Sequence, residues 1–132
     1  KACLAWGAIW DYHATWKKRI DQAFKTELSV PGHHIQWILN AKTMDDALAK
    51  LDGFRLDGVV QKMRCPFLLV HGEGDKQIPM KDARALYNAV GSKDKTMKVF
   101  TVKEGGSQHC QRDNLSIGTA YMFDWLKEKL GA

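Results

Sequence analysis

Two kinds of hydrophobic pattern divide the chain. Near the start, Tyr12, Trp16, Ile20 and Phe24 recur every fourth position among charged residues, which is the period of a helix with one buried face. Residues 65–71 instead form an unbroken apolar run, typical of a strand buried on both faces of a parallel sheet. The pattern therefore predicts a helical segment followed by a parallel α/β segment.

Shorter signals complete the element order. An apolar run at 2–6 ends at a glycine and predicts a strand, and residues 98–102 predict another. From residue 65 onward the order strand, helix, strand, loop, helix is typical of a parallel sheet covered by helices, so we expect the α/β class. The other expected helices lie at 12–24, 33–40, 43–53, 56–63 and 79–90, and the last one buries Thr119, Met122, Phe123, Leu126 and Leu130.

The helical segment is longer than a strand connection requires. Roughly fifty residues separate the first two expected strands, whereas a crossover needs only about a dozen. We expect residues 1–10 to supply a core strand, residues 11–58 a helical cap insertion, and residues 59–132 the C-terminal α/β core. Because ligands bind at the carboxyl ends of parallel strands, an insertion after a strand is well placed to cover a site.

Composition describes an ordinary globular protein. The formal charge of +5 comes from basic residues spread among acidic ones, so we expect no nucleic-acid partner. No stretch approaches the ~20 apolar residues of a membrane span, and the first seven residues are too short for a signal peptide. Three separated cysteines without metal-ligand spacing predict reduced thiols and no metal. We expect a cytoplasmic protein without a membrane partner, and a homodimer is left open.

Two residues carry the candidate chemistry. Asp75 follows the buried strand in a Gly-Glu-Gly-Asp loop, and His109 follows the next strand after Gly105-Gly106. Loops after parallel strands meet at one sheet edge, so a carboxylate can orient an imidazole that acts as a base. We interpret Asp75 and His109 as the acid and base of a catalytic triad. No serine has the G-x-S-x-G surroundings of a triad nucleophile; the four are Ser29, Ser92, Ser107 and Ser116.

Plainer roles compete with this interpretation. Asp75 has the residue type and position to cap the helix that starts near Pro79, and a single loop histidine is often a surface residue. His71 is expected to be a hydrogen-bonded structural histidine, and Glu73 to face solvent. Cys110 is expected to point away from His109, because adjacent residues in a turn usually diverge.

Aromatic residues cluster in and before the expected cap. Binding pockets are mostly apolar with a few polar groups, so Trp10, His13 and Trp37 are candidate substrate contacts. Tyr12 and Trp16 share the helical stripe and are better explained by packing. No RNA-binding motif accompanies these aromatics.

The residues from 63 to 130 resemble the end of α/β-hydrolases, in which an H-G-x-x-D-x-x-x-P stretch supplies the acid and a late histidine completes the triad. Here that stretch is His71, Gly72, Asp75 and Pro79, and the histidine is His109. Together with Trp6-Gly-Ala-Ile-Trp-Asp11 and Gly105-Gly106-Ser-Gln-His-Cys110, the chain is similar to the subfamily of 2,6-dihydroxypseudooxynicotine hydrolase and related fungal hydrolases.

This resemblance implies a serine hydrolase that cleaves an ester or a carbon–carbon bond next to a carbonyl in a small organic substrate, with no cofactor. The nucleophile is expected in an N-terminal portion of the same protein, upstream of a chain that begins in mid-strand, so the chain alone is expected to be inactive. The alternative is a non-catalytic α/β binding module or a degenerate hydrolase.

Overall fold

The computed structural model describes residues 1–23 and 33–131. The chain divides into two compact units, one formed by residues 1–10 and 57–132 and the other by residues 11–56. The first unit is thus assembled from two stretches of sequence that the second unit separates. We refer to them as the sheet unit and the helical unit.

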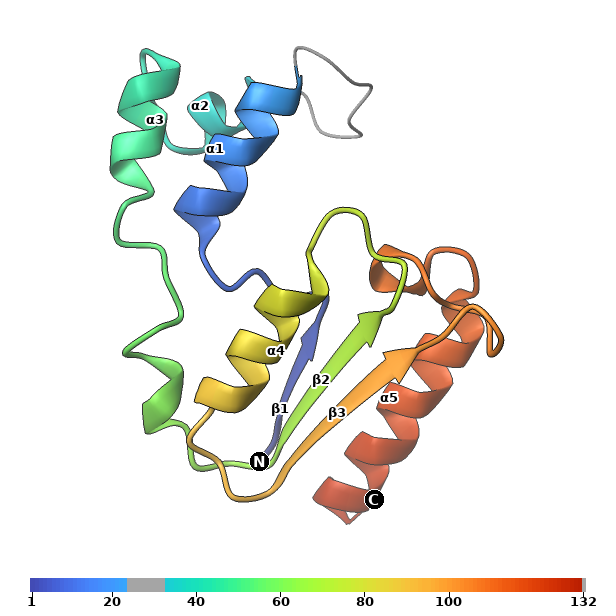
Figure 1. Ribbon diagram of the computed structural model, residues 1–132. Helices are drawn as coiled ribbons and strands as arrows, with labels where there is room; N and C mark the ends of the chain where they lie inside the picture. The colour runs from blue at the N-terminus through green and yellow to red at the C-terminus, as the bar shows by residue number, and fades with distance from the viewer. Residues whose placement is uncertain (24–32, 132) are drawn as a thin grey trace. The chain divides into compact units, whose positions relative to one another are not determined.

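The sheet unit is built on three parallel strands in the order β1 (Cys3–Trp6), β2 (Phe67–Gly72), β3 (Lys95–Phe100). Cys3 pairs with Phe67, and Phe67 pairs in turn with Lys95, so the three strands start together. Their carboxyl ends consequently lie at the same edge of the sheet, as Figure 1 shows. The loops after β2 and β3 leave from this edge.

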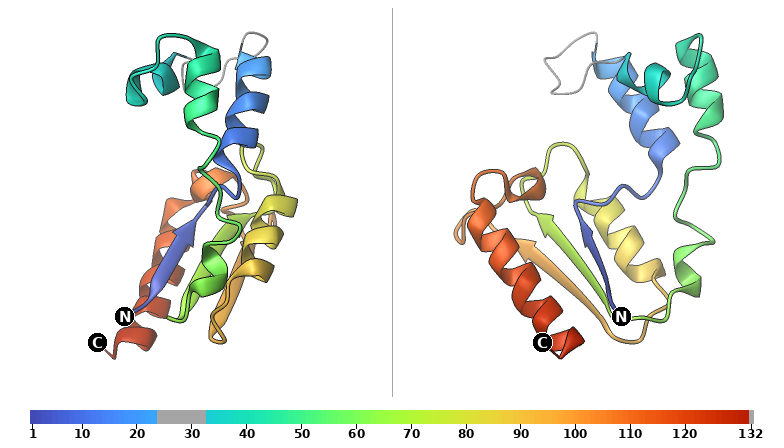
Figure 2. Two further views of the ribbon diagram at one scale, coloured as in Figure 1. Left: turned by 90° about the vertical axis from the view of Figure 1, so that its left-hand side faces the viewer. Right: turned by 180° about the vertical axis from the view of Figure 1, so that it is seen from behind.

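Helices cover both faces of this sheet. α4 (Met80–Ala89) lies on one face and α5 (Leu115–Leu130) on the other, which the side view of Figure 2 shows clearly. β2 is the central strand and is buried along its whole length, as its unbroken apolar run predicts. The α/β class expected from the sequence is therefore confirmed.

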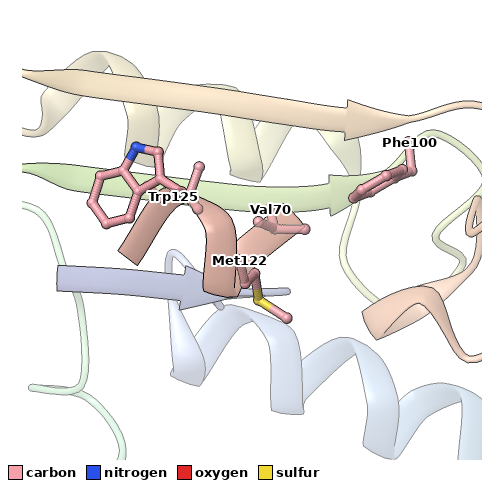
Figure 3. Packing of buried hydrophobic residues seen from close by; sticks show 5 residues of the cluster. Val70, Phe100, Met122 and Trp125 are labelled. Atoms are coloured by element: carbon pink, nitrogen blue, oxygen red, sulfur yellow. The ribbon is translucent and has the colours of Figure 1, made fainter. Parts of the chain in front are cut away.

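The face of α5 that packs on the sheet differs from the predicted one. Met122 and Trp125 are buried against Val70 and Phe100, whereas Phe123 is 69% exposed; Figure 3 shows this packing. Gly118 and Met122 lie one helical turn apart and Trp125 follows three positions later, which defines a stripe with helical period. The prediction that Phe123 and Leu130 share the buried face was wrong because α5 is apolar on both sides.

Two predicted boundaries also move. β3 begins at Lys95 and ends at Phe100, because the backbone N–H of Thr101 donates to the Glu104 carboxylate in a turn instead of continuing the strand. The helix expected at 56–63 is reduced to one 3₁₀ turn, η1 (Val60–Lys62).

The helical unit contains α1 (Tyr12–Ala23), α2 (His34–Ile38) and α3 (Met44–Lys50). Trp16 is buried with Ile35 and Ala47, which confirms its packing role. α3 begins as predicted, since the Thr43 hydroxyl accepts the backbone N–H of Asp46. The end of the first predicted helix, including Phe24, falls outside the described residues.

Candidate active site

Asp75 and His109 meet at the carboxyl edge of the sheet. Asp75 lies in the loop after β2, and His109 opens the 3₁₀ turn η2 (His109–Gln111) in the loop after β3. His109 Nδ1 lies 2.7 Å from Asp75 Oδ2, so the predicted hydrogen bond between these side chains is confirmed. Asp75 and His109 are 34 positions apart in the sequence, and the parallel strand topology brings them together.

The two carboxylate oxygens of Asp75 accept hydrogen bonds from different partners. Oδ2 faces His109, while Oδ1 accepts the backbone N–H groups of Gln77 and Ile78 at 2.8 and 2.9 Å. The turn-capping role and the pairing with histidine, which the sequence offers as alternatives, therefore coexist in one residue. With its side chain 1% exposed, Asp75 is held in a single orientation.

The charge state of Asp75 follows from these bonds. Burial raises the pKa of Asp75. The hydrogen bonds from His109 and from the backbone of Ile78 and Gln77 lower it by more, so the net pKa lies below the ordinary value. Asp75 is consequently ionised at neutral pH and can only accept hydrogen bonds. His109 Nδ1 must then carry the hydrogen that it donates, which leaves the lone pair of the neutral ring on Nε2.

The backbone that leads to His109 is held from two sides. The Asp113 carboxylate accepts the backbone N–H groups of Ser107 and Gln108, at 2.9 and 3.0 Å. From the other side, the carbonyl of Ser107 accepts the N–H of Gly74. A side chain at Gly72 would place a Cβ only 2.2 Å from that same carbonyl oxygen, so only glycine permits the two loops to approach this closely.

Cys110 contradicts the expectation from the sequence. Its Sγ lies 3.4 Å from Nε2 of His109, the adjacent residue, and the thiol is half-buried. The cause is the backbone, since Cys110 and Gln111 both adopt φ near +49°, the left-handed region, and the chain turns back on the imidazole. Gly7 closes this corner, because a Cβ there would lie 3.0 Å from Cys110 Sγ and from His109 Cε1.

Gln111 joins the same turn to the end of β1. Its side chain is fully buried, and its Oε1 accepts the indole N–H of Trp6 at 2.6 Å. Gly118 of α5 packs directly on the Gln111 side chain. The turn that carries His109 is thereby fixed to both β1 and α5.

His71 also departs from its expected role. It is fully buried, yet neither ring nitrogen has a hydrogen-bond partner among the described residues, and Nδ1 lies 4.0 Å from Asp75 Oδ2. Burial lowers the pKa of His71 and favours the neutral ring, although the nearby negative charge of Asp75 acts in the opposite direction. Glu73 is exposed as expected, and its carboxylate accepts the backbone N–H of Val102.

A pocket of about 420 Å³ opens beside His109. The loops after β2 and β3 both line it, and its lining includes two cationic side chains, Lys76 and Arg112, and no carboxylate. The lining residues are Gly74, Lys76, Gln77, Ser107, Gln108, His109 and Arg112.

The three candidate substrate contacts fall in different places. Trp10 belongs to the sheet unit and is half-buried, whereas His13 and Trp37 belong to the helical unit. Trp37 is 80% exposed and stacks on His34, with ring centroids 6.2 Å apart. None of the three lines the pocket beside His109.

Asp113 and Gln111 are the supporting residues that the sequence did not reveal. An Asp-Asn pair before a helix predicts a cap, and Asn114 does cap α5, but nothing marks Asp113 as the acceptor for the loop behind it. Within residues 1–23 and 33–131, no group of three His, Cys, Asp or Glu side chains is arranged to hold a metal. No helix in that same part of the chain is long and apolar enough to cross a membrane.

Two comparisons with known proteins match this chain. Residues 19–103 match the family described as serine aminopeptidase, S33, a stretch that includes Asp75 and stops before His109. The crystal structure of 2,6-dihydroxy-pseudo-oxynicotine hydrolase is similar over 98% of this chain, with a TM-score of 0.68 and 21% identity. The chain spans about a third of that protein's length. No curated protein matches the sequence.

The family match covers well over half of the 132 residues. The structural match shows the fold over nearly the whole chain. The chain belongs to the serine aminopeptidase S33 family of hydrolases and has the fold of an α/β-hydrolase.

Proposed function

We propose that Asp75 and His109 activate a serine nucleophile that lies outside these 132 residues, in a hydrolase acting on a small carbonyl substrate. The observation that carries the proposal is the 2.7 Å bond from His109 Nδ1 to a buried carboxylate that two backbone N–H groups also hold. Geometry of this kind fixes the tautomer that a general base needs.

The mechanism uses Nε2, the ring nitrogen of His109 that is not bonded to Asp75. Nε2 of His109 takes the proton of the serine hydroxyl as the oxygen attacks the substrate carbonyl, and the charge of Asp75 stabilises the imidazolium that forms. His109 then returns this proton to the leaving group. In the second half of the cycle, Nε2 removes a proton from the water that releases the acyl group.

The scissile bond is an ester or a carbon–carbon bond next to a carbonyl in this proposal. The fold shared with a structure named for 2,6-dihydroxy-pseudo-oxynicotine supports a small organic substrate, and membership of a serine aminopeptidase family supports a serine nucleophile. No serine of the chain meets the requirements of the nucleophile turn.

The helical unit serves as a cap in this proposal. Its sequence position between β1 and β2 and its concentration of aromatic residues support that role. Substitutions Trp10→Ala, His13→Ala and Trp37→Ala in the complete enzyme are expected to raise KM and leave kcat nearly unchanged, as loss of uniform binding does. An effect on kcat alone would contradict a binding role.

The experiment is ester hydrolysis by the complete gene product. Asp75→Asn and His109→Ala are each expected to lower kcat by roughly 10³–10⁴-fold, because the base loses its orientation or is absent. Asp124→Asn is the matched control, since Asp124 is an exposed carboxylate on α5. The 132-residue chain alone should give no burst of acyl-enzyme with activated esters.

Three results would count against the proposal. Unchanged kcat in both Asp75→Asn and His109→Ala would remove the pair from catalysis. Stoichiometric labelling of a serine in the isolated chain by a fluorophosphonate would place the nucleophile inside it. A complete gene product without any hydrolase activity would favour the binding-module alternative.

A further inference from the structure

The thiol of Cys110 lies against the one nitrogen of His109 that Asp75 leaves free. Nδ1 is occupied by its bond to Asp75, and Cys110 Sγ is 3.4 Å from Nε2. Sulfur, imidazole and carboxylate thus form a continuous array within this chain. A nucleophile in contact with a base that a third group orients is the general arrangement of an activated side chain.

We propose that Cys110 is a nucleophilic thiol that uses His109 as its base and reacts with soft carbon electrophiles, namely alkenes conjugated to a carbonyl group. Cys110 as a residue is half-buried, and the proposal requires that a small uncharged electrophile reaches its sulfur. This modification site needs no residue outside the chain.

The base is required because the resting sulfur is protonated. Burial raises the pKa of the Cys110 thiol, and the negative charge of Asp75 raises it further. A free thiolate is therefore scarce at neutral pH, and Cys110 without assistance would be a poor nucleophile. The proton has to leave during the attack. Two acceptors lie near the sulfur, the Trp6 carbonyl oxygen at 3.8 Å and Nε2 of His109 at 3.4 Å, and only Nε2 is basic enough to take the proton.

The step balances without any further reactant. The S–H proton moves to Nε2 while sulfur forms a bond to the β-carbon of the alkene, and the π electrons shift to give an enolate. Asp75 stabilises the imidazolium through the Nδ1–H bond. The enolate α-carbon then takes the proton from Nε2, which leaves a thioether and restores the neutral ring.

Two other cysteines of the chain provide internal controls. Cys3 is half-buried, and burial raises its pKa too, but the ionisable group that affects it is the thiol of Cys65 rather than an imidazole. Cys65 is likewise half-buried. All three thiols react with the same reagent in the same molecule. The ratio of their reaction rates is therefore independent of differences in concentration and handling.

The test is the rate of N-ethylmaleimide addition at each cysteine of the full chain, followed by peptide mass spectrometry. His109→Ala is expected to slow the reaction of Cys110 by about tenfold or more, since a general base contributes at least this much. The rates at Cys3 and Cys65 should stay within about twofold of the parent. Asp75→Asn should slow Cys110 as well, because the imidazole loses its orienting partner.

A second variant guards against a disturbed loop. His109→Gln keeps a polar side chain of similar reach and removes the base, so it should slow Cys110 as His109→Ala does. A Cys110 rate that is unchanged or increased in both variants would overturn the proposal. If the rate of Cys110 is the same in the parent, in the His109 variants and in Asp75→Asn, then Cys110 is an ordinary half-buried thiol.

Discussion

At the scale of single residues, Asp75 shows how one side chain serves both the loop and the candidate site. Its Oδ1 closes the turn before α4, and its Oδ2 accepts from His109. A carboxylate that accepts three hydrogen bonds is stabilised in its ionised form. The stability of the sheet unit should therefore depend on pH in the acid range.

The expected direction follows from the lowered pKa of Asp75. The stabilisation is present above the unfolded-state pKa of about 3.9 and is lost as pH falls through the lower folded-state pKa. Urea unfolding between pH 7 and pH 3 should show a weaker pH dependence in Asp75→Asn than in the parent. Asp124→Asn, at an exposed position, should keep the parental dependence; equal curves for all three proteins would contradict this.

Gly7 offers a second prediction. An alanine at this position would have an unfavourable positive φ of 61°, and its Cβ would lie 3.0 Å from atoms of Cys110 and His109. Gly58 has a positive φ of 79° with nothing within 4 Å, so Gly58→Ala isolates the backbone strain. Gly7→Ala should destabilise the protein by about 1 kcal/mol more than Gly58→Ala in urea unfolding. Equal losses would mean that the corner beside His109 is not tightly packed.

Asp75 and His109 could be predicted from the sequence because topology brings them together. Any two loops after adjacent parallel strands share an edge, and the residue types then suffice. Cys110 could not be predicted, because its position depends on two consecutive left-handed residues that are not glycine. Local sequence gives no reason for that conformation; packing of Gln111 against Trp6 and Gly118 holds it in place.

At the scale of elements, α5 carries apolar residues around its circumference, yet only one of its faces is buried. Trp125 is 7% exposed and Phe123 is 69% exposed, although both are large and aromatic. Trp125→Ala should cost roughly 3–5 kcal/mol of unfolding free energy, and Phe123→Ala should stay within about 0.5 kcal/mol of the parent. Similar losses for both, measured by chemical denaturation, would restore the face predicted from the sequence.

Elements with one unambiguous pattern were predictable, and those with two were not. β2 is apolar at every position, and its burial on both faces follows directly. α5 carries aromatic residues around its circumference, so periodicity alone could not select Met122 and Trp125 over Phe123. The choice is made by the sheet, where Val70 and Phe100 present a complementary surface.

At the scale of the whole molecule, the sheet has an edge at β1. Cys3 and Gly7 donate their backbone N–H groups to Pro66 and Val70, and the alternation of a strand directs those of Leu4 and Trp6 away from β2. Amide hydrogen exchange of the isolated chain should therefore be slower at Gly7 than at Leu4 and Trp6. In the complete gene product, Leu4 and Trp6 should become protected if a further strand pairs there; equal exchange in both proteins would exclude such pairing.

The separation of the sheet unit into two stretches of sequence has a kinetic consequence. Cys3 pairs with Phe67, 64 positions away, whereas Phe67 pairs with Lys95 after only 28. Closing the longer loop costs more chain entropy, so β1 should join a β2–α4–β3 nucleus late in folding. Stopped-flow measurements should find that Leu4→Ala in β1 mainly accelerates unfolding, while Leu68→Ala in β2 slows folding. The reason is that β2 is ordered in the folding transition state and β1 is not.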